Sequence, residues 1–224
     1  MYKNIEVLDK QKHEKLKYDQ VDLTEVSRSI GIVPLGVHEV LDMSSFSPVL
    51  ISAGDESELI AFTGISKDVT IYKKTNIFIP TFLRCYPFLS INIKNDKGTV
   101  DTVIAIDNNK DVVGKNKKTS IFNKKSELEK GANEKISQIR ALNTQRDISR
   151  TIVKALKEKD LLVKKDFKIK LEDGERTILN EFYIVDRQKL LKLDDKTLAQ
   201  WARKGWMGII DAHLKSLNNF QRIF

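Results

Sequence analysis

The chain has 224 residues, 41% of them hydrophobic, and a net charge of +8, which suits one large domain or two small ones with a sizeable core. No run of eighteen apolar residues occurs, so a transmembrane helix is excluded. The single cysteine, Cys85, excludes an intramolecular disulfide and a cysteine-based metal site, and we interpret it as a small buried hydrophobe rather than a reactive thiol.

The N-terminal segment indicates where the protein resides. Residues 1–17 lack the apolar core of a signal peptide. We therefore expect a cytoplasmic protein, with surface association only by a route that reads no N-terminal signal.

The positive charge does not favour a nucleic-acid-binding protein. Thirty of the 39 basic residues are lysines, and they are scattered along the chain, whereas base readout and bidentate phosphate contacts favour arginine. The densest patch, residues 110–130, has seven lysines and a single aromatic residue, Phe122, so it offers no stacking platform. A solvated loop is the favoured interpretation; nonspecific binding of an anionic polymer is a weaker hypothesis that predicts strong salt dependence.

The first half of the chain is expected to form antiparallel strands. Short apolar or alternating segments, separated by turn residues, predict strands near 6–9, 26–35, 49–52, 59–65, 89–93 and 100–106. In the last of these we expect Val103 and Ile104 to be buried. Apolar spacing predicts a short helix over 37–43, and Pro80 suits the first turn of another, which would align Phe78, Phe82 and Tyr86 at helical spacing.

The second half is expected to be mainly helical. A polar, lysine-rich loop over 108–125 precedes a capping-box pattern, Ser126 and Glu129, and a long amphipathic helix to about residue 159, with a break near Leu142. A strand hairpin then turns at Asp173-Gly174. The remaining segments predict short helices capped by Asp186 and by Asp194 or Asp195, then a final helix over 206–217 after Gly205. We predict one α+β domain over 1–224, with the C-terminal helices packed on the sheet.

Three stretches resemble the SapC family, which is named for a protein associated with bacterial surface layers. The first joins Ile32-Val33-Pro34-Leu35 to Phe46-Ser47-Pro48-Val49. The second, residues 79–88, looks like the family's Pro-x-Phe-x-Arg-x-Tyr-Pro-Phe element, with Cys85 in place of a polar or basic residue. The third runs from the Asp173-Gly174 hairpin to Ala212-His213-Leu214-x-Ser216-Leu217-x-Asn219. The resemblance implies an accessory protein linked to surface-layer biogenesis and supplies no catalytic residues to carry over.

His213 is the leading single candidate for chemistry. Ile209, Ile210 and Leu217 share its helix face, so it would be either a base or ligand near Asn218 and Asn219, or a buried residue bonded to a backbone carbonyl. The second interpretation is favoured. A metal site would need further ligands, and His13, in a charged and mobile-looking stretch, and His38 stand in unrelated contexts.

Arg84 and Tyr86 form the second candidate pair. Arg84 could bind a carboxylate or phosphate, or pair with a buried aspartate or a ring. An enzyme or small-ligand-binding protein acting on a peptide or small molecule would need Arg84, Tyr86 and His213 to converge in one pocket.

The favoured hypothesis is a non-catalytic protein, without cofactor or metal, that binds a protein or peptide partner such as a surface-layer or export component. Its oligomeric state is left open. The candidate partner-binding residues are Phe78, Phe82, Arg84, Tyr86, His213 and Asn219.

Overall fold

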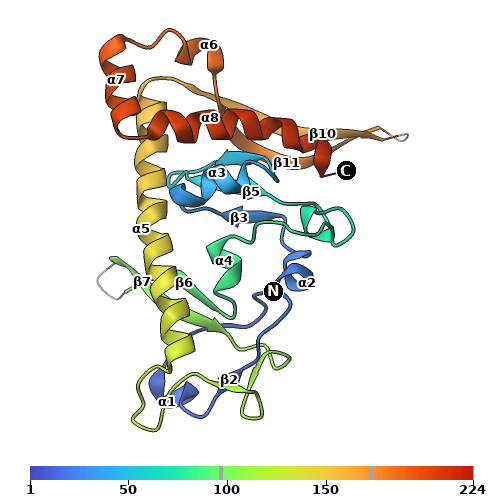
Figure 1. The fold of residues 1–224 in the computed structure, drawn as a ribbon, viewed down its shortest axis with the longest axis vertical. Helices are drawn as coiled ribbons and strands as arrows, with labels where there is room; N and C mark the ends of the chain where they lie inside the picture. The colour runs from blue at the N-terminus through green and yellow to red at the C-terminus, as the bar shows by residue number, and fades with distance from the viewer. Residues whose placement is uncertain (96–97, 172–173, 224) are drawn as a thin grey trace. The chain divides into compact units, whose positions relative to one another are not determined.

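The protein is α+β, as predicted, in a computed structural model that describes residues 1–95, 98–171 and 174–223 (Figure 1). The chain forms two compact units: residues 1–27 with 81–143 form unit 1, and residues 28–80 with 144–224 form unit 2. Within the described ranges, no helix combines the length and apolarity needed to cross a membrane. The prediction of a single domain stays a prediction.

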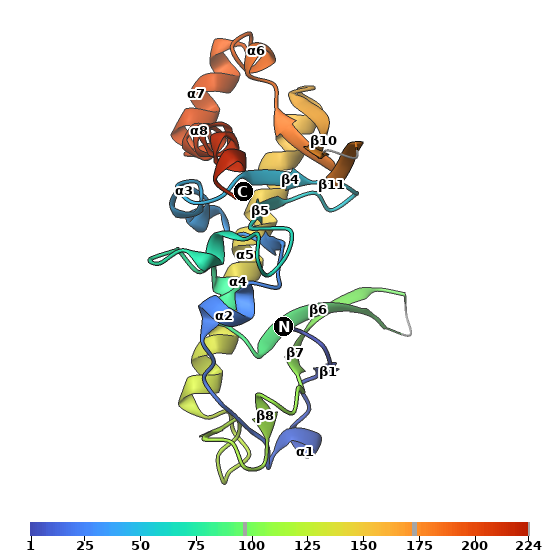
Figure 2. The same ribbon diagram turned by 90° about the vertical axis from the view of Figure 1, so that its right-hand side faces the viewer.

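Unit 1 contains two small antiparallel sheets. The first has the order β1 (Ile5–Val7), β7 (Val100–Asp107), β6 (Phe88–Lys94), and these strands run together in Figure 2. The second has the order β8 (Val113–Gly114), β2 (Lys17–Tyr18), β9 (Thr119–Ser120). Three short helices complete the unit beside the start of the long helix α5: α1 (Lys10–His13), α2 (Leu23–Ser27) and α4 (Thr81–Arg84).

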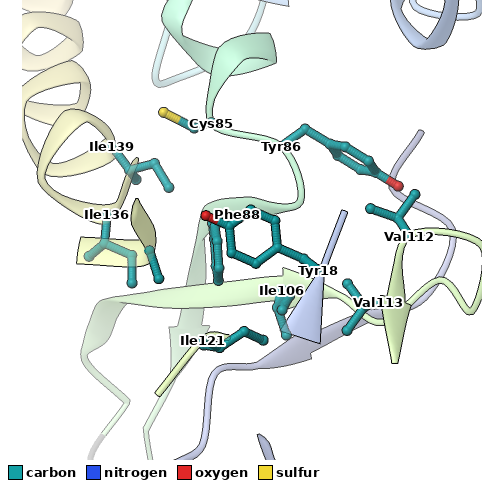
Figure 3. Packing of buried hydrophobic residues seen from close by; sticks show 11 residues of the cluster. Tyr18, Cys85, Tyr86, Phe88, Ile106, Val112, Val113, Ile121, Ile136 and Ile139 are labelled. Atoms are coloured by element: carbon teal, nitrogen blue, oxygen red, sulfur yellow. The ribbon is translucent and has the colours of Figure 1, made fainter. Parts of the chain in front are cut away.

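The core of unit 1 lies on one face of the β1–β7–β6 sheet (Figure 3). Phe88 and Ile106 lie directly opposite each other and are fully buried, and the ring of Tyr18 meets Phe88 edge-on at 5.4 Å between centroids. Burial along β7 rises toward its C-terminal end. Val103 and Ile104 are therefore only half-buried, contrary to the prediction, and Ala105 and Ile106 are the buried residues.

The lysine-rich segment is tied to the rest of unit 1 by β8 and β9, which pair with the two edges of β2. Val112, Val113 and Ile121 bring apolar side chains from this segment into the core. The loop expected over 108–125 thus includes short paired strands, and its mobility stays a prediction. His13, expected in a mobile stretch, is buried, and its ring bonds the backbone of Asp9.

Helix α5 (Lys130–Glu158) is continuous, so the predicted break near Leu142 is wrong. The boundary between the two units nevertheless falls at this place, between Asn143 and Thr144. The capping box is also wrong, because α5 begins only at Lys130 and the Ser126 hydroxyl donates a hydrogen bond to Glu14 instead.

Unit 2 is built on a five-stranded antiparallel sheet. Its strand order is β10 (Leu162–Leu171), β11 (Gly174–Val185), β4 (Val49–Ser52), β5 (Leu59–Phe62), β3 (Ile32–Pro34). The predicted hairpin is confirmed in its strands, and its turn residue Asp173 lies outside the described residues. The C-terminal helix α8 (Trp206–Ser216) contacts β4 and β11, so the predicted packing of helix on sheet is confirmed (Figure 1).

The short helices of unit 2 begin where capping residues allow. Asp186 accepts hydrogen bonds from the first turn of α6 (Arg187–Leu190), and Asp194 does so for α7 (Asp195–Arg203). Gly205 has a φ of 74° and separates α7 from α8 in a left-handed conformation that suits glycine. The remaining turns of helix are η1 (Val37–Glu39), α3 (Val40–Met43), η2 (Ile71–Lys73) and η3 (Leu217–Arg222).

The aromatic segment does not form the continuous helical stripe that its spacing predicts. Helix α4 covers four residues, so Phe78 precedes it and Tyr86 follows it. A proline cannot continue a helix and disfavours helical backbone in the residue before it, which explains why α4 ends ahead of the Tyr86-Pro87 pair. Only Phe82 of the three aromatic side chains is helical.

Candidate functional site

His213 sits in the core of unit 2 and joins two strands. It projects from α8, is 1% exposed, and uses both ring nitrogens. Nδ1 donates to the carbonyl oxygen of Val49 on β4 at 2.7 Å, and Nε2 accepts from the amide of Val185 on β11 at 3.1 Å. These two bonds identify the proton on Nδ1, since Nε2 must offer its lone pair to the amide.

The sheet register explains why a side chain is needed at this place. Strands β4 and β11 pair at Ser52–Phe182 and Ile51–Tyr183, and the same register would bring Val49 opposite Val185. The imidazole instead bridges these two residues, accepting from one strand and donating to the other as a peptide group would. Buried backbone groups that lack a partner are costly, so the ring satisfies a requirement that the sheet itself leaves open.

Ser216 and Asn219, which follow His213 in the C-terminal segment, attach this segment to the rest of unit 2 as well. The Ser216 hydroxyl accepts from the amide of Val49 at 2.8 Å and donates to the carbonyl of His213 at 2.6 Å. The Asn219 side chain donates to the carbonyl of Ser44 at 2.7 Å. The polar residues that make this segment distinctive in the sequence therefore bind backbone within unit 2.

The electrostatics of His213 agree with a neutral, structural ring. Burial lowers the pKa of His213 from 6.5 to about 4, and the bond to the Val49 carbonyl, which favours the protonated form, opposes this only in part. The ring is therefore uncharged near neutral pH. Its Nε2 lone pair is already engaged and is not offered to a substrate or metal.

Tyr86 occupies a second polar cluster, in the core of unit 1. Its hydroxyl donates to Oδ2 of Asp107 at 2.9 Å, and Oδ1 of Asp107 accepts from the amides of Lys3 and Asn4 at 3.1 and 2.8 Å. Burial, followed by the bond to the Asp107 carboxylate, raises the pKa of Tyr86 well above its ordinary value. This cluster attaches the first strand of the chain to the end of β7.

Tyr2 adds an aromatic contact to this cluster. Its ring lies 5.3 Å from the rings of both Phe82 and Tyr86, and its hydroxyl donates to the backbone carbonyl of Phe82. Burial raises the pKa of Tyr2, so this hydroxyl stays protonated. Phe82 itself is half-buried.

Arg84 is the last residue of α4, and its predicted binding of a carboxylate, a phosphate, a buried aspartate or a ring stays a prediction. The Arg84 side chain is exposed, and its Nη2 donates to the Thr81 hydroxyl at 2.6 Å. Its carbonyl accepts from the Lys135 amine at 2.6 Å. Cys85 is fully buried beside α5, as predicted.

The candidate residues are distributed over both units. Phe82, Arg84 and Tyr86 belong to unit 1, whereas Phe78, His213 and Asn219 belong to unit 2. Because Arg84 and Tyr86 belong to one unit and His213 to the other, the convergence of the three residues that an enzyme would need stays a prediction. Among the described residues, no group of three or more His, Cys, Asp or Glu side chains is placed to hold a metal ion.

A hollow in unit 2 was not predicted from the sequence. It measures about 480 Å³ and is lined by Gly31, Ile32, Phe62, Gly64, Ile65, Ser66, Arg176, Thr177, Ile178 and Leu179. Gly31 and Gly64 approach so closely that a Cβ on Gly31 would lie 2.6 Å from the Gly64 carbonyl oxygen. A side chain there would force the two backbones apart and change the wall of the groove.

The other wall of this hollow, a groove in unit 2, is formed by residues 176–179 of β11, where the β10–β11 hairpin is irregular. Pairing shifts register on both sides of Phe167, and Glu181 has a φ of 53° with its amide bonded to the Asp166 carboxylate at 2.8 Å. Past the bend, the Phe167 ring stacks on Phe220 at 4.5 Å and lies 5.9 Å from Phe62. Register shifts of this kind depend on contacts far apart in the chain, which is why the pattern of residues did not predict the groove.

Two smaller hollows are also present. One, about 250 Å³, lies in unit 2 between the turn from β4 to β5 and Arg150, Lys154 and Lys157 of α5. Arg150 is already paired there with Glu56 and Glu58. The other, about 140 Å³, lies in unit 1 and is lined by Tyr18, Gln20, Val21, Leu23, Tyr86 and Lys135. Tyr86 is thus one wall of a hollow that holds Lys135, whose pKa burial lowers.

Comparison with known proteins gives one match. Residues 8–223 match the family model described as SapC. Neither the curated proteins nor the solved structures contain a match to this chain.

Replacing His213 with glutamine is expected to destabilise unit 2 by about 2–4 kcal/mol, because one amide cannot reproduce both bonds in the same place and a buried backbone group loses its partner. The pH dependence should change as well. The folded-state pKa lies below the ordinary value, so the unfolded state binds more protons between pH 6.5 and about 4. His213 therefore contributes stability that is present above pH 6.5 and falls by up to about 3 kcal/mol as the pH drops to 4.

Denaturant unfolding of both proteins from pH 7.5 to 4 measures this difference. The loss of stability on acidification should be smaller in the glutamine variant than in the wild type. Parallel pH curves for the two proteins would contradict a neutral, buried His213.

Replacing Tyr86 with phenylalanine is expected to destabilise the protein by about 1–3 kcal/mol, since one oxygen of the buried Asp107 carboxylate loses its donor. The matched control is Tyr183→Phe on β11, where the side chain is half-buried. Equilibrium unfolding in urea compares the two. An equal or smaller cost for Tyr86→Phe would mean that the Asp107 bond contributes nothing specific.

Proposed function

The chain belongs to the SapC family, and from that premise we propose that it is a non-catalytic accessory protein that binds a protein or peptide partner in bacterial surface-layer biogenesis or export. The hydrogen bonds of the leading chemical candidates support this proposal. Both ring nitrogens of His213 are bonded to backbone, and the hydroxyl of Tyr86 is bonded to Asp107. Side chains committed in this way stabilise a fold.

The observation that carries the proposal is the groove in unit 2. It is open, and its lining combines apolar side chains (Ile32, Phe62 and Ile178 among them) with two glycines, Gly31 and Gly64, and one cation, Arg176. Such a lining suits an extended peptide with apolar side chains and a carboxylate, because arginine binds carboxylates in a two-pronged geometry. The net charge of +8 favours the same acidic partner.

The aromatic segment supplies further candidate contacts for the partner in this proposal. In unit 1, Phe82 is half-buried and Arg84 is exposed, and in unit 2 Phe78 is half-buried, so each of them presents atoms to solvent. Tyr86, His213 and Asn219 are buried, and we assign them the role of holding the accessible residues in place. An enzyme acting through Arg84, Tyr86 and His213 is the competing proposal, and it requires the three to meet in one pocket.

Reversing the charge of Arg176 tests the groove. Tagged wild-type chain and the Arg176→Glu variant would be cross-linked in bacterial cells that carry a surface layer, and the captured polypeptides would be compared by quantitative mass spectrometry. We expect a surface-layer or export polypeptide whose capture falls about tenfold in the variant, the effect of losing one favourable charge contact.

Arg187→Glu is the matched control, because Arg187 is also exposed and lies in unit 2 on α6, outside the groove. Its capture profile should equal that of the wild type. Identical profiles for all three proteins would reject the groove as the binding site. Capture of no surface-layer or export component by the wild type would reject the proposed function.

A further inference from the structure

Among the residues that the structure describes, no strand pairs with the outer edge of β6 in the β1–β7–β6 sheet of unit 1. Strand β6 is the last strand in that order and pairs with β7 through seven consecutive residue pairs without a register shift. The strand contains no proline, and its sole charged residue is Lys94 at the end. Natural sheets usually protect such an edge by a bulge, a proline or inward charges, and β6 has none of these within its seven residues.

The outer half of β6 is exposed and apolar at alternate positions. Ile91 and Ile93 lie on the sheet face opposite the one through which Phe88 enters the core. Ile91 is half-buried, and Ile93 is 36% exposed. Between them Asn92 is exposed on the other face, where its side-chain oxygen Oδ1 accepts a hydrogen bond from the Thr102 hydroxyl of β7.

The order of residues along this edge is nearly symmetric. Residues 90–94 read Ser-Ile-Asn-Ile-Lys, so the pattern of polar and isoleucine positions is the same in both directions. A strand of this kind is complementary to an antiparallel copy of itself. Antiparallel pairing with a second copy of the chain uses this symmetry, whereas pairing with a strand of another protein would not require it.

We propose that β6 pairs with β6 of a second copy of this chain, antiparallel and with the twofold axis at Asn92, to form a continuous six-stranded sheet. Each Ile91 then lies opposite Ile93 of the partner subunit, and such β-branched cross-strand pairs stabilise a sheet. Each Lys94 lies opposite the partner subunit's Ser90. No like charges face each other, and the two asparagines meet at the axis.

Neighbouring registers are less favourable. A twofold axis at Ile91 would bring Lys94 opposite the partner subunit's Phe88, which is fully buried in its own core. A twofold axis at Ile93 would place Ile91 opposite the partner subunit's Asn95 and leave one isoleucine pair, between the two Ile93 side chains, in place of two. The register centred on Asn92 is therefore the one in which every pair is compatible.

The contact is short, five residues from each chain, and well below the area of a standard stable interface of about 1,600 Å². We expect a dimer with a dissociation constant on the order of 10–100 µM. Analytical ultracentrifugation of the full chain over a concentration series of about 1–300 µM would cover this range. Sedimentation as a monomer at every concentration would overturn the proposal.

Charge at the axis provides a test of the register. In Asn92→Lys, and likewise in Asn92→Glu, two like charges face each other, so each variant alone should dissociate at least tenfold more readily than the wild type. An equimolar mixture of the two places Lys opposite Glu and should restore the dimer. A mixture that stays monomeric would overturn the register proposed.

The matched controls are Gln11→Lys and Gln11→Glu. Gln11 is an exposed amide residue of unit 1, on α1 and outside the β1–β7–β6 sheet. These variants introduce the same charges away from the β6 edge and should dimerise within about threefold of the wild type. Equal loss of dimer in the Asn92 and Gln11 variants would assign the effect to net charge and reject pairing through the β6 edge.

Discussion

The arrangement of unit 2 depends on a single imidazole that takes the place of a peptide group. Strands β4 and β11 stop pairing before Val49 and Val185, and His213 bonds the buried carbonyl of one and the amide of the other. Only a side chain with a donor and an acceptor on opposite sides can do this, and neutral histidine has both. The Ser216 hydroxyl satisfies the remaining amide of Val49, so the final helix and the sheet form one hydrogen-bonded structure.

Asp107 plays the comparable role in unit 1. Its carboxylate is fully buried, and three donors surround it: the hydroxyl of Tyr86 and two backbone amides near the start of the chain. A buried carboxylate is tolerated only when it is satisfied in this way. The shared logic explains why the family-like motifs are rich in polar residues at buried positions. The Tyr86 and His213 of those motifs bind backbone or a buried acid in the core.

The features that depend on residues close together in the chain were predicted correctly. The caps at Asp186 and Asp194, the left-handed Gly205 and the strands of both hairpins follow from residue chemistry within a few positions. The buried, backbone-bonded interpretation of His213 was favoured from the sequence, although its two partners could not be identified. The errors concern long-range effects: the continuity of α5 through Leu142, the pairing of the lysine-rich segment with β2, and the hairpin bend that makes the groove. Each depends on contacts that spacing along the chain does not encode.

Each unit combines two segments that are far apart in the chain, so neither unit can be completed until its second segment has been synthesised. Unit 2 needs Val49 and His213 together, and 164 residues separate them. On a ribosome that adds about 5–20 residues each second, β4 and β5 emerge roughly ten seconds or more before the helix that satisfies Val49. During that interval the apolar strands lack their cover, and contacts of such long sequence separation also form slowly. The nascent β4–β5 hairpin is therefore a segment to which a chaperone that binds apolar strands could attach during synthesis.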